Sequence, residues 1–411
     1  MLVGTTGVER VPALTREPNS VGAPSKQAAE GGIAIERPRM LVAQAESVGE
    51  GGPGEGGGPV LGTITEFRLS STDPDAFNYD AKAQVGAYVD LVSETYDGAL
   101  AAANGLKDAI AALADDPTAA SIETARAAWA EARGTYLRTE AFLFYAGPVD
   151  GPGGPFPRLN GWPVDPAAID AILADSEQSL NFRAIARLNS VEPPIKITTG
   201  LHVIEYLLWG RGGGDAIGTD AFAGDAGARR ADYAKALAQL LVNDLSVVTA
   251  AWAPGANNYR ASVEAMDQRN ALGRAFNGMT VLLGYEIPLR RIGAGLFPAN
   301  ENFQPSPFSQ TSADDLRFAF EGAVGVYQRA GLETLLREID PELESKVADG
   351  FATAKAAVAE LDAPYERFLA PPSGSAERLA AEAAVKALTN LARDLRQAGN
   401  RLGILVVVPG M

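Results

Sequence analysis

Residues 341–368, PELESKVADGFATAKAAVAELDAPYERF, carry the clearest fold signal in this chain. Their apolar residues fall at steps of three or four: Leu343, Val347, Phe351, Ala354, Val358, Leu361, Tyr365 and Phe368. Such steps place side chains on one face of an α-helix. The stretch therefore predicts a helix over Pro341–Phe368 with one buried side.

Apolar residues with the same spacing recur from residue 78 to the end of the chain. No segment alternates apolar and polar residues as a half-buried strand would. We therefore expect an all-α fold of two packed helical bundles with about four helices each, the first over residues 76–255 and the second over residues 256–411. The other predicted helices are Asn78–Ala114, Thr118–Tyr145, Pro194–Gly210, Arg229–Trp252, Asn258–Leu283, Thr311–Arg337 and Ser375–Leu405.

Residues 1–75 differ in composition from the rest of the chain. They contain the tract EGGPGEGGGP at residues 50–59, which cannot bury enough apolar surface to offset its chain entropy. We expect a long, irregular, tether-like tail here. Residues 1–30 lack the continuous apolar run of a signal peptide, so either the protein is not exported or the chain begins after a removed leader.

The composition excludes several classes of function. The chain has 411 residues, a formal net charge of −16, no cysteine and a single histidine, His202. The negative charge repels nucleic-acid backbones, so no nucleic-acid partner is expected, and it suits capture of a cation. Without cysteine there is no disulfide or thiolate site, and one histidine excludes a zinc site with two imidazoles within one chain. No apolar run reaches the roughly 18–20 residues of a transmembrane helix.

His202 lies in GLHVIEYLLWG, residues 200–210, three positions before Glu205. On a helix this spacing places the imidazole and the carboxylate on one face. Their neighbours are apolar, so both side chains are expected to be buried or to line a cavity, where polar groups need partners. Three kinds of partner remain open: a metal ion, a bound ligand, or each other as a structural pair.

Other short motifs precede this one in the chain: YVDLV at residues 88–92, TEAF at 139–142, GPVD at 147–150 and RLNGWPVD at 158–165. Together with GxHxxE at residues 200–205 they resemble the imelysin family, over roughly residues 79–402. The resemblance implies two packed helical bundles, a periplasmic or envelope-attached location and a role in iron uptake. It also implies other envelope iron-uptake proteins as partners.

The candidate metal ligands are His202, Glu205 and, within the TEAF motif, Glu140. One imidazole with carboxylates suits iron or another divalent metal better than it suits a classical zinc protease, so we expect binding of a metal ion or a metal chelate. Because the family is classed as metallopeptidases, peptidase activity with Glu205 as the general base is one alternative. A non-catalytic interaction module with a structural His–Glu pair is the other.

The matched loop adds Arg158, Asn160 and Trp162 as candidate ligand-binding residues. Arg158 can pair with a carboxylate or an anionic chelator. Asn160 can instead cap the loop backbone, and Trp162 can belong to the core.

Two partial matches in the second half add Glu286, Arg291 and Ser309 as candidate ligand-binding residues. LGYE at residues 283–286, with Arg291, resembles a family helix, but Glu286 and Arg291 can equally form an internal ion pair. Phe308 and Ser309 resemble the start of the family motif Phe-Ser-Asp-Asn-Thr. This chain continues with Gln310 and Thr311 instead, which removes potential metal ligands.

Overall fold

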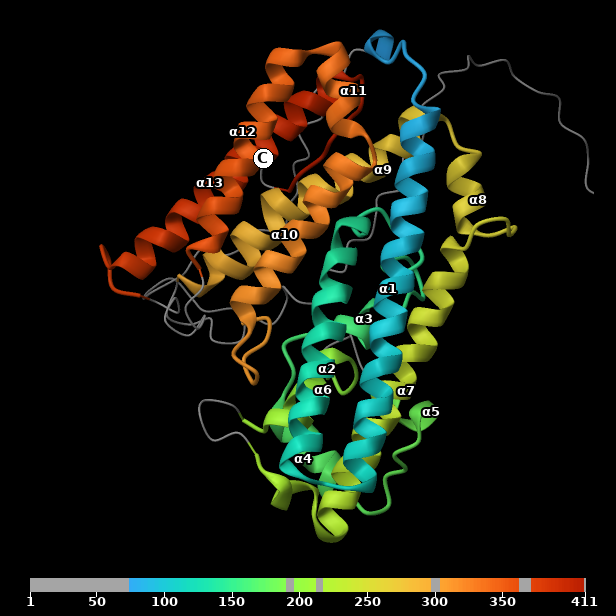
Figure 1. Ribbon diagram of the computed structural model, residues 1–411, viewed down its shortest axis with the longest axis vertical. Helices are drawn as coiled ribbons and strands as arrows, with labels where there is room; N and C mark the ends of the chain where they lie inside the picture. Colours follow the sequence, from blue (N-terminus) through green and yellow to red (C-terminus); the bar gives the residue numbers. More distant parts are fainter. Residues whose placement is uncertain (1–73, 190–195, 212–216, 297–303, 362–370, 410–411) are drawn as a thin grey trace, which may run out of the picture. The chain divides into compact units, whose positions relative to one another are not determined.

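The computed structural model describes residues 74–189, 196–211, 217–296, 304–361 and 371–409, all of which belong to one unit. Every regular element of the described residues is a helix, which confirms the all-α prediction (Figure 1). None of these helices is long and apolar enough to cross a bilayer. The predicted tail lies outside the described residues, except for its last two.

The elements are, in chain order, η2 (Pro74–Ala76), α1 (Lys82–Asp115), α2 (Ala119–Leu137), η3 (Arg138–Phe142), α3 (Phe156–Asn160), α4 (Pro166–Ala174), α5 (Phe182–Ile185), α6 (Leu201–Trp209), η4 (Thr219–Phe222), α7 (Gly224–Trp252), α8 (Tyr259–Glu264), α9 (Gln268–Val281), η5 (Leu282–Gly293), α10 (Ser312–Arg329), α11 (Leu332–Ile339), α12 (Pro341–Ala359) and α13 (Ala376–Arg401). η2, η3 and η4 are 3₁₀ helices, and η5 is a π-helix.

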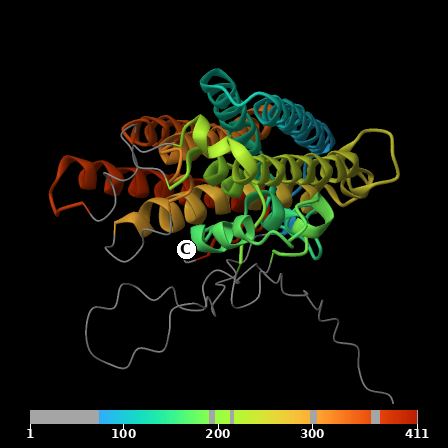
Figure 2. The same ribbon diagram turned by 90° about the horizontal axis from the view of Figure 1, so that it is seen from below.

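The long helices α1, α2 and α7 pack together, and Figures 1 and 2 show α1 and α7 running side by side. A reciprocal cap begins α2: the Thr118 hydroxyl accepts from the Ser121 N–H at 3.1 Å, and the Ser121 hydroxyl accepts from the Thr118 N–H at 2.9 Å. Later in the chain, α13 packs against both α12 and η5. The assignment of these groups to separate bundles at residues 76–255 and 256–411 stays a prediction.

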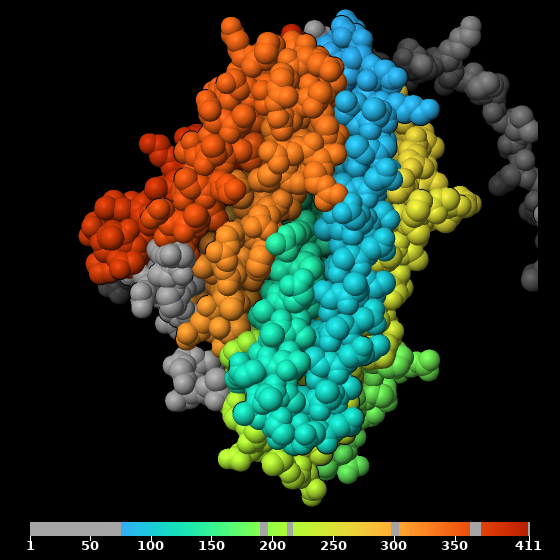
Figure 3. All heavy atoms as spheres, in the orientation of Figure 1, coloured from blue at the N-terminus to red at the C-terminus, as the bar shows by residue number. Residues whose placement is uncertain are grey.

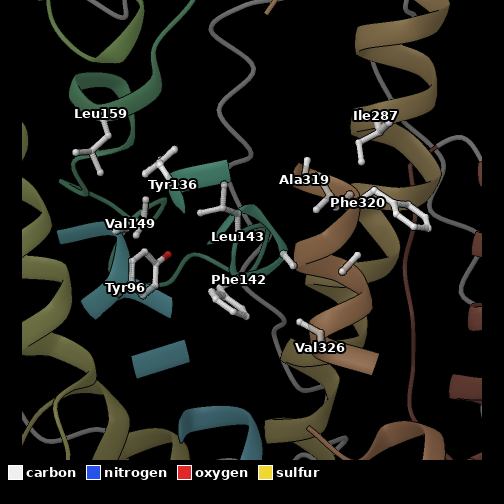
Figure 4. Packing of buried hydrophobic residues seen from close by; sticks show 14 of the residues in the cluster. Tyr96, Tyr136, Phe142, Leu143, Val149, Leu159, Ile287, Ala319, Phe320 and Val326 are labelled. Atoms are coloured by element: carbon white, nitrogen blue, oxygen red, sulfur yellow. The ribbon is translucent and has the colours of Figure 1, made fainter. Parts of the chain in front are cut away.

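The short helix η3 packs against α2 from the first group and also against α9 and α10, both of which contact η5. Two glycines allow this close approach. A Cβ on Gly278 of α9 would lie 2.2 Å from the carbonyl oxygen of Ala141, and one on Gly322 of α10 would lie 2.4 Å from that of Arg138. Figure 4 shows side chains of the 136–143 segment beside those of α10, and Figure 3 shows α10 (orange) against α2 (teal).

Three predicted helices are broken in the structure. The prediction over Thr118–Tyr145 is wrong after Leu137, where the chain tightens into η3. The prediction over Asn258–Leu283 is wrong between α8 and α9, because Asp267 caps a new helix by accepting from a backbone N–H of its first turn. The prediction over Thr311–Arg337 is wrong at Gly331, whose φ of 73° is left-handed and ends α10.

The last two predicted helices are shorter than expected. α12 ends at Ala359, and the rest of its predicted apolar stripe beyond Leu361 falls outside the described residues. α13 ends at Arg401 and is followed by an extended, largely buried segment, residues 404–408. The Asn277 side chain bonds to the backbone of this segment. It accepts from the Val407 N–H at 2.8 Å and donates to the Leu405 carbonyl at 3.3 Å. The predictions omitted α3, α4 and α5 and did not anticipate the π geometry of η5.

Candidate functional site

The nine-residue helix α6, which carries His202 and Glu205, is held at both ends. A helix this short is marginal on its own. It begins after Gly200, whose φ of 95° suits glycine, and the Trp129 indole donates to its first carbonyl at 2.8 Å. Arg126 and Arg230 donate to carbonyls of its last turn at 2.9 and 3.1 Å. These contacts hold both ends of α6 in place.

His202 and Glu205 face each other in the protein interior, as their spacing predicts. Their side chains are 2 % and 0 % exposed, and His202 Nδ1 lies 3.5 Å from Glu205 Oε2. The other imidazole nitrogen, Nε2, lies 3.1 Å from Asn160 Oδ1. Because an amide oxygen only accepts hydrogen bonds, Nε2 is the donor of this pair. A neutral His202 therefore presents a lone pair on Nδ1 to Glu205.

The second carboxylate oxygen of Glu205 holds the segment that precedes α10. Glu205 Oε1 accepts from the N–H groups of Phe308 and Ser309 at 2.9 and 2.7 Å, and from the Ser309 hydroxyl at 2.8 Å. Ser309 Oγ also lies 2.8 Å from the Thr311 hydroxyl. One carboxylate oxygen thus fixes a segment more than 100 positions away in the sequence.

Asn160, at the end of α3, connects His202 to two charged residues, Arg133 and Glu140. Its Oδ1 also accepts from Arg133 Nη1, and its Nδ2 donates to Glu140 Oε1 at 3.0 Å. Arg133 in turn donates to Asp315 Oδ2 at 2.8 and 3.1 Å, with side chains only 2 % and 1 % exposed. We call the following residues, some of which are described below, the buried network: Arg133, Glu140, Asn160, His202, Glu205, Glu286, Arg290, Arg291, Ser306, Ser309 and Asp315.

The π-helix η5 supplies the remaining charges of the buried network. In π geometry, residues four and five apart lie on one face. Glu286 can therefore contact both Arg290 and Arg291, each with a nitrogen 3.4 Å from a carboxylate oxygen. Arg291 also lies 2.9 Å from Glu140. Pro288 inside η5 lacks the N–H of a regular helix, which accounts for the local widening.

Burial and neighbouring charges set the protonation states of the network. Burial lowers the pKa of His202 well below its ordinary value, and the positive charges of Arg133 and Arg291 lower it further. Burial raises the pKa of Glu205 to about 8, despite the opposing hydrogen bonds from Ser309. Burial alone would raise the pKa of Glu286, but its two arginine neighbours hold it below the ordinary value. The His–Glu pair is therefore a neutral imidazole beside a protonated carboxyl at pH 7.

This assignment predicts a pH dependence of stability that Glu205→Gln removes. The folded chain keeps the Glu205 proton up to about pH 8, whereas the unfolded chain loses it near pH 4.5, so stability falls as pH rises between these values. Below pH 6.5 the unfolded His202 takes up a proton that the folded one does not, which opposes this slope. Between pH 6.5 and 8 we expect a net loss of about 1 kcal/mol, because each group is half-titrated at one end of this range.

Urea unfolding at the two pH values measures the effect. The glutamine amide can accept the same bonds and donate to His202, so the variant should fold and lose the slope. Glu321→Gln, at an exposed surface pair, is the control that should keep it. Equal slopes in the wild type and in Glu205→Gln would contradict the assignment.

Seven of the nine predicted site residues lie in the buried network: Glu140, Asn160, His202, Glu205, Glu286, Arg291 and Ser309. Arg158 lies outside it, and Trp162 borders it at Arg290. Arg158 pairs with Asp244 through two hydrogen bonds of 2.9 and 2.7 Å. Trp162 is buried, with the Arg290 guanidinium 5.9 Å from its ring centre.

Three residues of the buried network were not predicted from the sequence: Arg133, Ser306 and Asp315. Ser306 Oγ donates to Asp315 at 2.7 Å, which completes the partners of that carboxylate. One signal for Arg133 was available: it follows Trp129 by four positions and so shares the apolar face of its helix.

The donors of the network, as arranged, do not fit a metal ion. Within the described ranges, no group of three or more His, Cys, Asp or Glu side chains comes together as ligands. The Glu140 carboxylate is bound by Arg291 and Asn160. The same positive charges that lower the pKa of His202 would also oppose a cation beside it. Ligation of iron or another metal by His202, Glu205 and Glu140 stays a prediction.

Comparison with known proteins identifies relatives of this chain. The family model for imelysin matches residues 92–395. The iron-regulated protein A of Synechococcus elongatus is 26 % identical over 324 residues, which cover 74 % of this chain and 83 % of that protein.

Two crystal structures share the fold. One is of a protein described as an iron-regulated protein A precursor from Parabacteroides distasonis, with a TM-score of 0.66, 18 % identity and coverage of 83 % of this chain and 99 % of that one. The other is of an imelysin-like protein from Psychrobacter arcticum, with a TM-score of 0.63, 15 % identity and coverage of 84 % and 100 %. The family match, which extends over most of the sequence, shows that this chain belongs to the imelysin family.

Proposed function

We propose that this chain is a binding protein of iron-related physiology in the cell envelope, and that its His-x-x-Glu pair is a structural joint rather than a metal centre. One observation carries the second part of the proposal. All four polar side-chain atoms of His202 and Glu205 lie beside protein partners. A buried polar group with such partners needs no ligand to be stable.

The positions of the network residues support a joint. Arg133 and Asn160 precede the predicted bundle boundary at residue 255, whereas Arg291 and Asp315 follow it. Arg133 donates directly to Asp315. Asn160 is connected to Arg291 through Glu140, to which both side chains donate. Removing one member would leave a charge or a dipole unpaired in the core, so the network penalises separation of the two halves.

The geometry of Glu205 favours a binding protein over a peptidase. A general base needs a free lone pair within reach of a water molecule or substrate. Here Oε1 already accepts three hydrogen bonds, and the side chain is fully buried. Peptide cleavage would first require the segment that precedes α10 to leave.

The link to iron is supported by the relatives, since the Synechococcus protein is named for its regulation by iron. The family resemblance supports an envelope location. We propose that the chain acts there with a metal chelate, beside other envelope iron-uptake proteins.

Metal content and thermal unfolding test the joint. Incubation with ferrous iron followed by desalting should leave far less than one metal per chain, and iron should not shift the melting temperature. His202→Ala and Asn160→Ala should each lower the free energy of unfolding by about 2 kcal/mol, because each leaves buried partners unsatisfied.

Asn160→Ala is the matched control, since Asn160 belongs to the network but is not a candidate metal ligand. One iron per chain that is lost in His202→Ala but retained in Asn160→Ala would overturn the joint and establish a metal centre. Equal behaviour of the two variants, without bound metal, supports the joint.

A further inference from the structure

A hollow of about 350 Å³ lies beside the loop of residues 146–155, and no residue of the buried network lines it. Its other walls are Arg158, Asp244, Val247 and Tyr259. This volume is at the small end of the range for pockets that hold small molecules. The hollow is therefore large enough for one compact ligand.

The loop that forms one wall is held in a costly conformation. Phe144 and Ala146 have φ values of 70° and 54°, which residues other than glycine rarely adopt. The Asp150 carboxylate stabilises this conformation by accepting from the N–H groups of Phe144 and Gly147 at 2.7 and 2.8 Å. Val149 anchors the loop in the core (Figure 4). Such strain persists only where the surroundings fix it, and it is concentrated at binding sites.

The polar wall is a self-neutralised ion pair. Arg158 and Asp244 make two parallel hydrogen bonds, and their side chains are 31 % and 11 % exposed. Because each charge compensates the other, an anion entering the hollow would meet the repulsion of Asp244, and a cation that of Arg158. The pair nevertheless places strong donors directly beside strong acceptors.

The remaining wall is a fixed aromatic ring. Tyr259 lies edge-on against Trp252, with ring centres 5.1 Å apart, and its hydroxyl accepts from Arg274 at 3.0 Å. Prolines of the loop add further apolar surface. The lining thus combines an aromatic side chain with a paired donor and acceptor.

We propose that this hollow binds a neutral, polyhydroxylated ligand of monosaccharide size. One ligand hydroxyl donates to the carboxylate of Asp244, a neighbouring hydroxyl accepts from the guanidinium of Arg158, and the C–H face of the sugar ring packs on Tyr259. This assignment is independent of the function proposed for the buried network.

Saturation-transfer NMR on the full chain tests the proposal with three matched probes: D-glucose, D-gluconate and D-glucosamine. They share most hydroxyls but carry no charge, a negative charge and a positive charge respectively. We expect glucose to bind at least threefold more tightly than either charged probe. Absence of transfer to glucose at tens of millimolar, or tighter binding of gluconate or glucosamine, would overturn the proposal.

Variants of the ion pair sharpen the test. Asp244→Asn leaves Arg158 uncompensated and should reverse the preference toward gluconate, whereas Arg158→Gln should reverse it toward glucosamine. Asp170→Asn, which makes the same charge change in a pair with Arg211 outside the hollow, should leave the preference unchanged. Tyr259→Ala should weaken glucose binding at least fivefold. Circular dichroism confirms folding of each variant, and unchanged preferences in both pair variants would contradict the assignment.

Discussion

Replacing Asp315 by alanine is expected to lower the free energy of unfolding by about 3–5 kcal/mol, the cost of removing one partner of a buried ion pair. Arg133 donates twice to Asp315, and both side chains are almost completely buried. The variant leaves the guanidinium charged, since arginine does not lose its proton in proteins, and leaves Ser306 without its acceptor. Urea unfolding at pH 7, followed by circular dichroism, measures the loss.

Glu321→Ala is the matched control because Glu321 also lies on α10 and also pairs with an arginine from the preceding half, Arg138. That pair is 38 % and 45 % exposed, so water and salt screen it, and its loss should cost no more than about 1 kcal/mol. A similar cost for Asp315→Ala and Glu321→Ala would mean that water reaches Arg133. The function proposed for the network would then lose its main energetic support.

The fold was predictable from the sequence wherever apolar spacing alone decides the structure. Apolar spacing correctly predicted the helices α1, α7 and most of α12. Burial of one apolar face is enough to stabilise a long helix, whichever elements cover that face. Breaks depend on single residues. The left-handed turn at Gly331 and the cap at Asp267 interrupt stripes that read as continuous, since neither residue changes the apolar spacing around it.

The site was predictable where a motif carried it, and not where its partners come from far along the chain. His202 and Glu205 face each other because three-residue spacing on a helix requires it. Arg133 and Asp315 are 182 positions apart, and no local pattern connects them. Arg158 and Asn160 are two positions apart in the same matched loop, yet they bond to different elements. Resemblance identified both residues, but only the fold separates their roles.

Replacing Gly322 by alanine is expected to destabilise the protein by about 3 kcal/mol, at the upper end of the usual cost of overpacking. The added Cβ would lie 2.4 Å from the carbonyl oxygen of Arg138 and 2.9 Å from its carbonyl carbon. Backbone atoms cannot rotate away as a flexible side chain can, so α10 and η3 must move apart. Because η3 carries Glu140, we expect its ion pair with Arg291 to lengthen at the same time.

Gly325→Ala is the control for Gly322→Ala. It shows whether the change in stability comes from the clash with η3 or from replacing any glycine of α10. Gly325 lies on the same helix, three residues further on, and apart from its chain neighbours and the backbone of its own helix no atom lies within 4 Å of its added Cβ. Alanine should stabilise α10 there by about 0.5–1 kcal/mol, because it restricts the unfolded chain. Thermal unfolding of the two variants should therefore move in opposite directions. If both are stabilised, η3 is not held against α10, and Glu140 owes its position to the polar contacts of the network alone.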